Sequence, residues 1–231
     1  MRSVLLRIPV PQWLQGWGLP ESIPIFAYGL AILISMLLTM VWATRRARSH
    51  HVGAQVVQDL CLWTLVSGIL GARLMHRLLY AEHYSGLMDF FNLPSGGLVL
   101  YGAFFTTPPA IWWICRKNGL SLELAARIFA PLLPLSIGLG RLGCFMNGCC
   151  YGRSCEAPWG VSFPNDALYP GYASFPVHPS QLYALGMGAA LCALLLWWER
   201  RRPQWSDFAH GLLFVGSYGV IRLIEEHFRD D

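Results

Sequence analysis

Arginines inside apolar stretches are the residues of this 231-residue chain with the clearest chemical potential. There are five of them: Arg73, Arg77, Arg127, Arg141 and Arg222. If these stretches cross a membrane, each charge costs at least about 2.5–3.5 kcal/mol unless it is paired, reaches the interface or faces a polar cavity. For Arg77 and Arg127, reaching the interface or pairing with a helix carbonyl is the simpler interpretation.

Arg141 and Arg222 are the candidates for binding. Arg141 lies in GLGRLG (138–143), where small residues allow close backbone approach around the guanidinium, and Arg222 has Glu226 four residues later as a helical partner. Two guanidiniums without a matching excess of carboxylates indicate an anionic ligand. A phosphate suits them because a guanidinium binds it through two parallel hydrogen bonds.

Seven cysteines form a second group, and four of them are crowded at Cys144, Cys149, Cys150 and Cys155. Their spacing does not match the paired C-x-x-C ligands of zinc sites, so we expect no metal. Close helix packing, a disulfide involving Cys155 and a metal site all remain open at this stage. His178 either orients a phosphate or packs at a helix start, which the following Pro179 and Ser180 mark.

The elements that must position these residues are membrane helices. The chain is 55% hydrophobic and only 13% charged, which excludes an ordinary soluble domain, and its 31 aromatic residues (Trp 10, Tyr 9, Phe 12) argue against disorder. No clustered basic face suggests nucleic-acid binding. The fold class we predict is an all-α polytopic bundle with six spans, at 24–44, 56–80, 97–115, 124–150 (broken by prolines), 180–198 and 208–226. Residues 1–23 are predicted to be an interfacial segment, and 24–231 a single transmembrane domain.

Positive charges predict the orientation of the spans. Eight cations occupy the connections after spans one, three and five: Arg45, Arg46, Arg48, Arg116, Lys117, Arg200, Arg201 and Arg202. The bias of cations toward the cytoplasm then places both termini outside. The longest loop, 151–178, also falls outside, and its Pro, Gly and aromatic residues, including Tyr169 and Tyr172, are typical of an ordered interfacial loop.

The segment GRLGCFMNGCCYGR (140–153) resembles the signature of the bacterial prolipoprotein diacylglyceryl transferase family. Further family-like stretches follow the same order along the chain: Tyr28-Gly29 with ATRRA (43–47), ILGARL (69–74), HPSQLY (178–183) and SYGVIRLIEEHFR (217–229). Together they cover residues 24–229, nearly the whole chain.

The resemblance implies a reaction at the outer face of the bacterial inner membrane. The diacylglyceryl group of phosphatidylglycerol would pass to the lipobox cysteine of a prolipoprotein signal peptide, without a cofactor, and glycerol phosphate would be released. The family's essential arginines fall on Arg141 and Arg222, which we expect to clamp the phosphate. The resemblance places the following residues around them as substrate-binding candidates: Tyr28, Arg73, Asn147, Gly148, His178, Tyr218 and Glu226. Asn147 either orients a phosphate or glyceryl oxygen or is a turn residue.

Three departures from the family pattern keep alternatives open. Tyr101 stands where the family has a histidine that is a candidate base, and a tyrosine with an ordinary pKa near 10 accepts protons poorly. Tyr101 is therefore either a catalytic group or a hydrogen-bonding one. Ala184 replaces the glutamate that follows HPSQLY, and the sequence stops at Asp231, where the family continues into a further span. A divergent member acting on another thiol or lipid, or a phospholipid-binding protein without catalysis, is the alternative.

Overall fold

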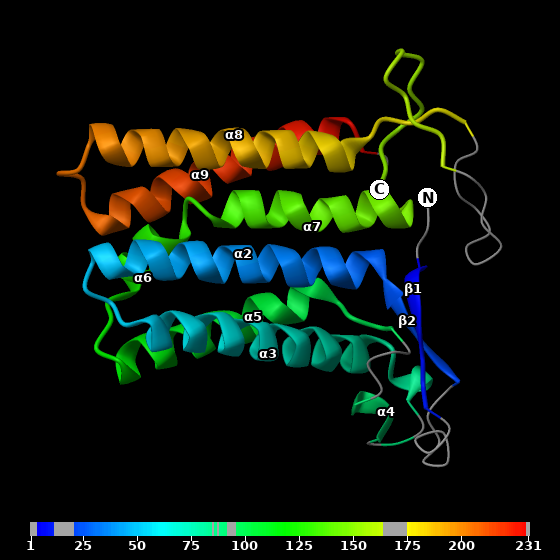
Figure 1. Cartoon of the computed structure of the whole chain (residues 1–231), viewed down its shortest axis with the longest axis horizontal. Coiled ribbons are helices and arrows are strands. Elements are labelled where there is room, and N and C mark those ends of the chain that lie inside the picture. The colour runs from blue at the N-terminus through cyan, green and yellow to red at the C-terminus, as the bar shows by residue number, and fades with distance from the viewer. Residues whose placement is uncertain are drawn as a thin grey trace. The chain divides into compact units, whose positions relative to one another are not determined.

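The computed structural model describes residues 4–11, 21–84, 86, 88–91, 96–163 and 175–229. It is predominantly helical (Figure 1), which confirms the predicted all-α membrane class. The chain forms two compact units, one made of Met1–Thr39 with Phe129–Asp231 and the other of Met40–Ile128. The division into an N-terminal segment and one domain from residue 24 stays a prediction.

The first unit contains the helices around Arg141. The first part of α2 (Ala27–Ser49) belongs to it, together with α7 (Leu133–Asn147), α8 (Ser180–Arg201) and α9 (Asp207–His227). Helix α7 packs along α8, and α8 packs on α9 (Figure 1). A buried hydroxyl pair joins α2 to α7, because Ser35 Oγ donates to the Ser136 carbonyl at 2.8 Å and lies 2.9 Å from the Ser136 hydroxyl.

The second unit is built on the pairing of α3 (Ala54–Leu79) with α5 (Leu100–Lys117). Gly71 and Gly102 face each other so closely that a Cβ on Gly71 would lie 2.6 Å from the Gly102 carbonyl oxygen. Glycine at both positions therefore permits the contact. Three short helices complete the described part of this unit: η1 (Ala81–His83), α4 (Met88–Phe91) and α6 (Leu122–Phe129).

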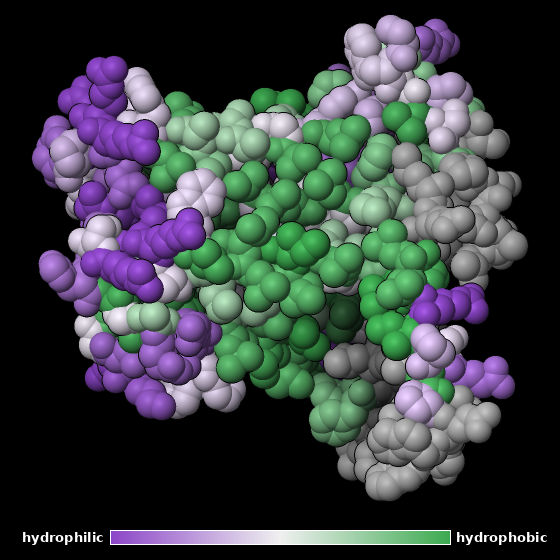
Figure 2. All heavy atoms as spheres, viewed as in Figure 1, coloured by the Kyte–Doolittle hydropathy of each residue, from purple (hydrophilic) through white to green (hydrophobic). Residues whose placement is uncertain are grey.

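In the part of the chain that the structure describes, four helices are long and apolar enough to cross a membrane, namely α2, α3, α8 and α9. The bent pair α6 and α7 would make a fifth. The sequence predicts six spans. The third predicted span is helical, as α5, but it is not among the candidate spans of the structure. Its prolines, threonines and terminal cations lower its mean hydropathy below that of the four helices named above. Figure 2 shows hydrophobic side chains along the helices and hydrophilic ones near their ends, as a bilayer requires.

The cationic connections predicted between the spans are largely helical. Arg45, Arg46 and Arg48 lie in the last turns of α2, and α5 and α8 likewise end on their own cations. Within the second unit, Arg46 donates from Nε to the Ile128 carbonyl at 3.0 Å and from Nη2 to the Arg127 carbonyl at 3.1 Å. Cations near a helix C-terminus satisfy carbonyls that lack intrahelical partners, which explains why the helices extend this far.

A two-stranded antiparallel sheet precedes the helices. The sequence analysis predicts no strands, so this sheet is a difference from the prediction. Strand β1 (Val4–Pro9) pairs with β2 (Ser22–Phe26) in a register that sets Ile8 opposite Ile23 and Pro9 opposite Ser22. Leu6 and Ile8 of β1 expose apolar side chains, as does Phe26 at the end of β2, and the interfacial location of residues 1–23 stays a prediction. Strand β2 runs directly into α2, so the sheet is continuous with the first membrane helix.

The long loop after α7 is ordered in its described parts, 151–163 and 175–179. Val177 forms antiparallel bridges with Ser154 and Val161, and the buried Phe163 packs on Val177. The Tyr151 ring stacks on Phe163 at 5.6 Å between centroids. This confirms an ordered loop in those parts, whereas Tyr169 and Tyr172 lie outside the described residues.

Candidate active site

Helix α7 presents Arg141 between two neighbouring helices. On one side a Cβ on Gly138 would lie 2.9 Å from Leu185 Cα of α8. On the other, a Cβ on Gly143 would lie 3.0 Å from Tyr28 Cα of α2. The small residues predicted to allow close backbone approach therefore do so on both sides of Arg141, and the helix that carries its guanidinium is wedged between α2 and α8.

A small cavity, partly open to its surroundings, lies against Arg141. It is bounded by α7, the turn after it, the start of α8 and the end of α9. Its lining residues are Arg141, Cys150, Ser180, Gln181, Ala184, Glu225 and Arg229. Only Arg141 among them was predicted as a site residue.

The cavity holds polar groups that lack protein partners. Among the described residues, none forms a hydrogen bond or ion pair with the half-buried Arg141 guanidinium. The amide of Gln181, which is 1% exposed, donates from Nε2 to the Cys149 carbonyl at 2.7 Å, but its Oε1 has no partner in that same part of the chain. A guanidinium that lines a cavity without a protein partner is suited to an anionic ligand.

Arg222 is placed differently from Arg141. Its Nη1 lies 3.2 Å from Glu225 Oε2 and its Nη2 lies 2.7 Å from Glu226 Oε2, so two carboxylates hold its guanidinium. The predicted partner Glu226 is therefore present, and Glu225 is an additional one. Arg222 is not among the lining residues, whereas Arg229 is. Arg141 and Arg229 are therefore the two arginines that line the cavity. The role of Arg222 as a phosphate clamp stays a prediction.

Four other predicted residues lie on α2, on α9 and at the end of α7. Tyr28, near the start of α2, lies against α7, where a Cβ on Gly143 would be 3.1 Å from Tyr28 Cδ2, and Tyr218 lies on α9. Asn147 is half-buried and its Nδ2 donates to Cys149 Sγ at 3.5 Å. Gly148 ends α7 with φ 74°, a left-handed conformation that favours glycine and turns the chain back toward the helix.

His178 has protein partners in the same unit. Its Nδ1 lies 3.0 Å from the Tyr183 hydroxyl, and its ring packs 5.5 Å from the Phe228 ring. Its backbone carbonyl accepts from Gly152 at 2.9 Å. These contacts agree with packing at the start of α8, and the role of His178 in binding a substrate stays a prediction.

Arg73 and Tyr101 belong to the second unit. Arg73 is 3% exposed and donates to the carbonyls of Asp89, Phe90, Gly96 and Gly97, so its guanidinium holds the segment after α3 together. Tyr101, at the start of α5, is 73% exposed. Neither placement tests the predicted role in substrate binding or catalysis.

The turn after α7 brings three cysteines together. The Sγ atoms of Cys144, Cys149 and Cys150 all lie within 4.8 Å of one another, and no disulfide joins the described cysteines. The neighbouring thiols of Cys144 and Cys149, together with the charges of Arg141 and Arg229, lower the pKa of Cys150. Sequence spacing did not predict this cluster, because a left-handed turn at Gly148 and Cys150 folds the chain back on the helix.

Sequence reasoning also missed Gln181, Glu225 and Arg229. Each stands beside or within a stretch singled out by sequence, HPSQLY or IEEHFR. The available signal was a polar residue in an apolar helix, but only the packing shows which of these side chains face Arg141.

Comparison with known proteins agrees with the motifs. The family model for prolipoprotein diacylglyceryl transferase matches residues 17–231. A phosphatidylglycerol–prolipoprotein diacylglyceryl transferase of Idiomarina loihiensis is 33% identical over 220 residues, covering 93% of this chain and 78% of that protein. The enzyme of that name from Bordetella bronchiseptica is 31% identical over 208 residues, 88% of this chain and 77% of its own length. This chain belongs to the prolipoprotein diacylglyceryl transferase family.

Proposed function

We propose that this protein transfers the diacylglyceryl group of phosphatidylglycerol to the lipobox cysteine of a prolipoprotein. The cysteine sulfur attacks a glyceryl carbon, a C–S bond forms, and the C–O bond to the phosphate breaks. The thiol proton passes to a base, and glycerol phosphate leaves with the bonding electrons. The family membership and the names of the relatives support this reaction.

The observation that carries the proposal is the open guanidinium of Arg141 in a cavity that Arg229 also lines. Negative charge grows on the phosphate as the C–O bond breaks, and a positioned guanidinium stabilises that charge most where water is scarce. Arginine keeps its proton there, whereas a lysine could lose it.

Other residues receive roles by family resemblance. Arg222 and Tyr101 are proposed catalytic residues together with Arg141, and Tyr101 would serve as the base or as a hydrogen-bond donor to the lipid. The proposed substrate-binding residues are Tyr28, Arg73, Asn147, Gly148, His178, Tyr218 and Glu226. Glu225 lines the cavity, and it joins this set as a buried carboxylate beside Arg222.

The proposed location is the bacterial inner membrane, with the cavity toward the outer face. Ser180 and Gln181 begin α8, and Arg200 and Arg201 end it. A helix of 22 residues is about 33 Å long, so these two ends lie on opposite sides of a hydrocarbon core. If the arginines mark the cytoplasmic side, the cavity opens outward, where secreted precursors emerge.

The test measures transfer by the purified protein in mixed micelles containing phosphatidylglycerol labelled in its acyl chains. A lipobox peptide is the acceptor, and mass spectrometry detects the thioether. Arg141→Ala is expected to lower the rate about 10²–10³-fold, as for loss of one donor to a developing oxyanion. Arg200→Ala, which removes an exposed arginine at the far end of α8, should leave the rate unchanged.

The other interpretations predict different results in the same assay. Bound phosphatidylglycerol without thioether formation by folded wild-type protein would indicate a lipid-binding protein. Transfer to a small thiol but not to the lipobox peptide would indicate a different acceptor. Full activity of Arg141→Ala would contradict the role of Arg141 even if the wild type makes the thioether.

A further inference from the structure

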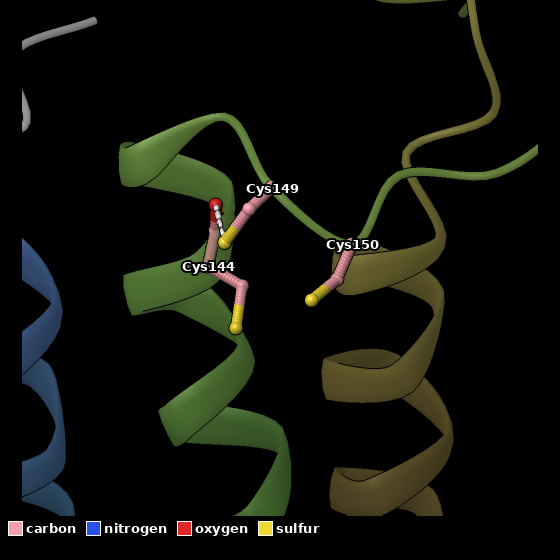
Figure 3. A group of neighbouring side chains, drawn as sticks. All are labelled: Cys144, Cys149 and Cys150. Atoms are coloured by element: carbon pink, nitrogen blue, oxygen red, sulfur yellow. Dashed lines mark hydrogen bonds between the residues drawn. The ribbon is translucent and has the colours of Figure 1, made fainter. Parts of the chain in front are cut away.

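Three thiols converge at the end of α7 (Figure 3). Cys144 lies in the last turn of the helix, and Cys149 and Cys150 follow its end, with all three sulfur atoms directed into the same space (Figure 3). The Cys149 amide donates to the Cys144 carbonyl at 3.0 Å, and Cys150 adopts a left-handed conformation with φ 60°. The backbone therefore brings residues five and six positions apart to one point.

The neighbouring helix holds this turn from outside. Gln181 donates to the Cys149 carbonyl at 2.7 Å, and the Ser180 hydroxyl donates to the Cys150 carbonyl at 2.9 Å. Both donors are buried. Asn147 Nδ2 points at Cys149 Sγ at 3.5 Å, an orientation suited to a hydrogen bond to a thiolate. The backbone of the turn that carries Cys149 and Cys150 is therefore held by α8, and one sulfur, that of Cys149, accepts a hydrogen bond of the kind that supports metal ligands.

The separations fit one metal ion. With metal–sulfur bonds of about 2.3 Å, three thiolates around one ion lie about 3.8–4.0 Å apart. The present sulfur atoms all lie within 4.8 Å of one another, so small side-chain rotations would close the set. Thiolates select soft or borderline ions, of which Cu⁺ and Zn²⁺ are the biological examples.

We propose that Cys144, Cys149 and Cys150 form a three-thiolate site for a thiophilic ion, Zn²⁺ or Cu⁺. No further His, Cys, Asp or Glu joins this group among the described residues. Three sulfur ligands would complete the coordination of Cu⁺, whereas Zn²⁺ would take a water as its fourth ligand. The site would carry net negative charge, which Arg141 and Arg229, at the cavity that Cys150 lines, would offset.

The ion would act on the position of Arg141. Cys144 lies one turn after Arg141 on α7, and the turn that carries Cys149 and Cys150 is bonded to α8. A metal bridging these ligands would fasten the arginine-bearing end of α7 to the α8 wall of the cavity. This positioning role does not depend on which acceptor the enzyme uses.

Metal titration of the purified, reduced protein in detergent tests the proposal. After removal of metal by a chelator, the protein is titrated with Zn²⁺, and separately with Cu⁺ under anaerobic conditions, against a coloured competing chelator. One ion per chain is expected in at least one series. Since loss of a supporting residue alone costs about 10–100-fold in affinity, Cys149→Ser and Cys150→Ser should each lose about 100-fold or more.

Two controls separate this site from other thiols. Cys155→Ser removes a buried cysteine of the same loop and should leave metal affinity unchanged, as should Cys61→Ser on α3. Bound metal should also protect all three cluster cysteines, but not Cys61, from alkylation counted by mass spectrometry. Cys144 is buried in the helix, so the two turn variants carry the test if Cys144→Ser does not fold.

Three results would overturn the proposal. They are absence of stoichiometric binding in both series, wild-type affinity in Cys149→Ser and Cys150→Ser, and a disulfide between two of the three cysteines in protein purified without reductant and free of metal.

Discussion

Replacing Arg73 by methionine separates a structural role for this arginine from the predicted role in substrate binding. The Arg73 side chain donates to four backbone carbonyls, including those of Phe90 at 3.0 Å and Asp89 at 2.6 Å, and its guanidinium lies 5.0 Å from the centre of the Tyr84 ring. Methionine fills a similar volume but leaves these carbonyls without their donor.

The magnitude follows from the number of bonds and the burial. Hydrogen bonds to a charged group contribute about 1.5–3 kcal/mol each, but the cost of burying the guanidinium offsets part of the total. A buried carbonyl left without its donor costs about 1–3 kcal/mol, and less where water can replace the lost partner. We therefore expect Arg73→Met to lower the free energy of unfolding by about 3 kcal/mol, which lowers Tm by about 6–12 °C for a chain of this size.

The assay compares thermal unfolding in detergent with the KM for phosphatidylglycerol. Arg77→Met is the matched control, because Arg77 is one turn further along α3 and contacts the Tyr84 ring at 5.6 Å, a contact worth about 0.5–1 kcal/mol. A structural role predicts a large fall in Tm for Arg73→Met with KM unchanged. An unchanged Tm with a KM raised tenfold or more would refute this reasoning and favour substrate binding.

Two further predictions concern the surroundings of Arg141. Gly143→Ala places a carbon 3.0 Å from Tyr28 Cα, whereas the new carbon of Gly140→Ala meets no atom within 4 Å. By denaturant titration, the Gly143→Ala protein should therefore be about 1–3 kcal/mol less stable than the Gly140→Ala protein. Equal stabilities would contradict the close packing of α2 on α7. In metal-depleted protein, the lowered pKa of Cys150 should make its alkylation rate rise less steeply between about pH 6 and pH 8 than that of a thiol with an ordinary pKa near 8.5, measured by mass spectrometry. A tenfold rise per pH unit would contradict that pKa.

The membrane helices could be predicted because an uninterrupted apolar stretch of some 20 residues is typical of a bilayer span and rare in a soluble domain. Their ends could not, since arginine is a good helix former and its long side chain lets a helix continue past the apolar core. Arg45, Arg46 and Arg48 therefore extend α2 where the sequence suggests a loop. The strand pair was missed because prolines at positions 9 and 11 favour neither helix nor strand, although Pro9 is tolerated at the end of β1.

Site residues that lie within one sequence motif could be predicted. Site residues that several elements bring together could not. Arg141 was recognisable from its small-residue surroundings within one segment. Glu225 and Arg229 reach the same cavity from α9 and the residues after it, which depends on how α9 packs on α8. The cysteine cluster depends on backbone torsions at Gly148 and Cys150, which local spacing rules for metal ligands do not represent.

The two carboxylates on Arg222 set how tightly the cavity can retain an anion. Glu225 and Glu226 together outweigh the single positive charge of Arg222, and Glu225 is also part of the cavity wall. If the cavity binds the phosphate as proposed, that phosphate meets attraction from Arg141 and Arg229 and repulsion from Glu225. Such a balance favours fast turnover, because a released phosphomonoester carries more negative charge than the bound diester and is repelled more strongly once the C–O bond has broken.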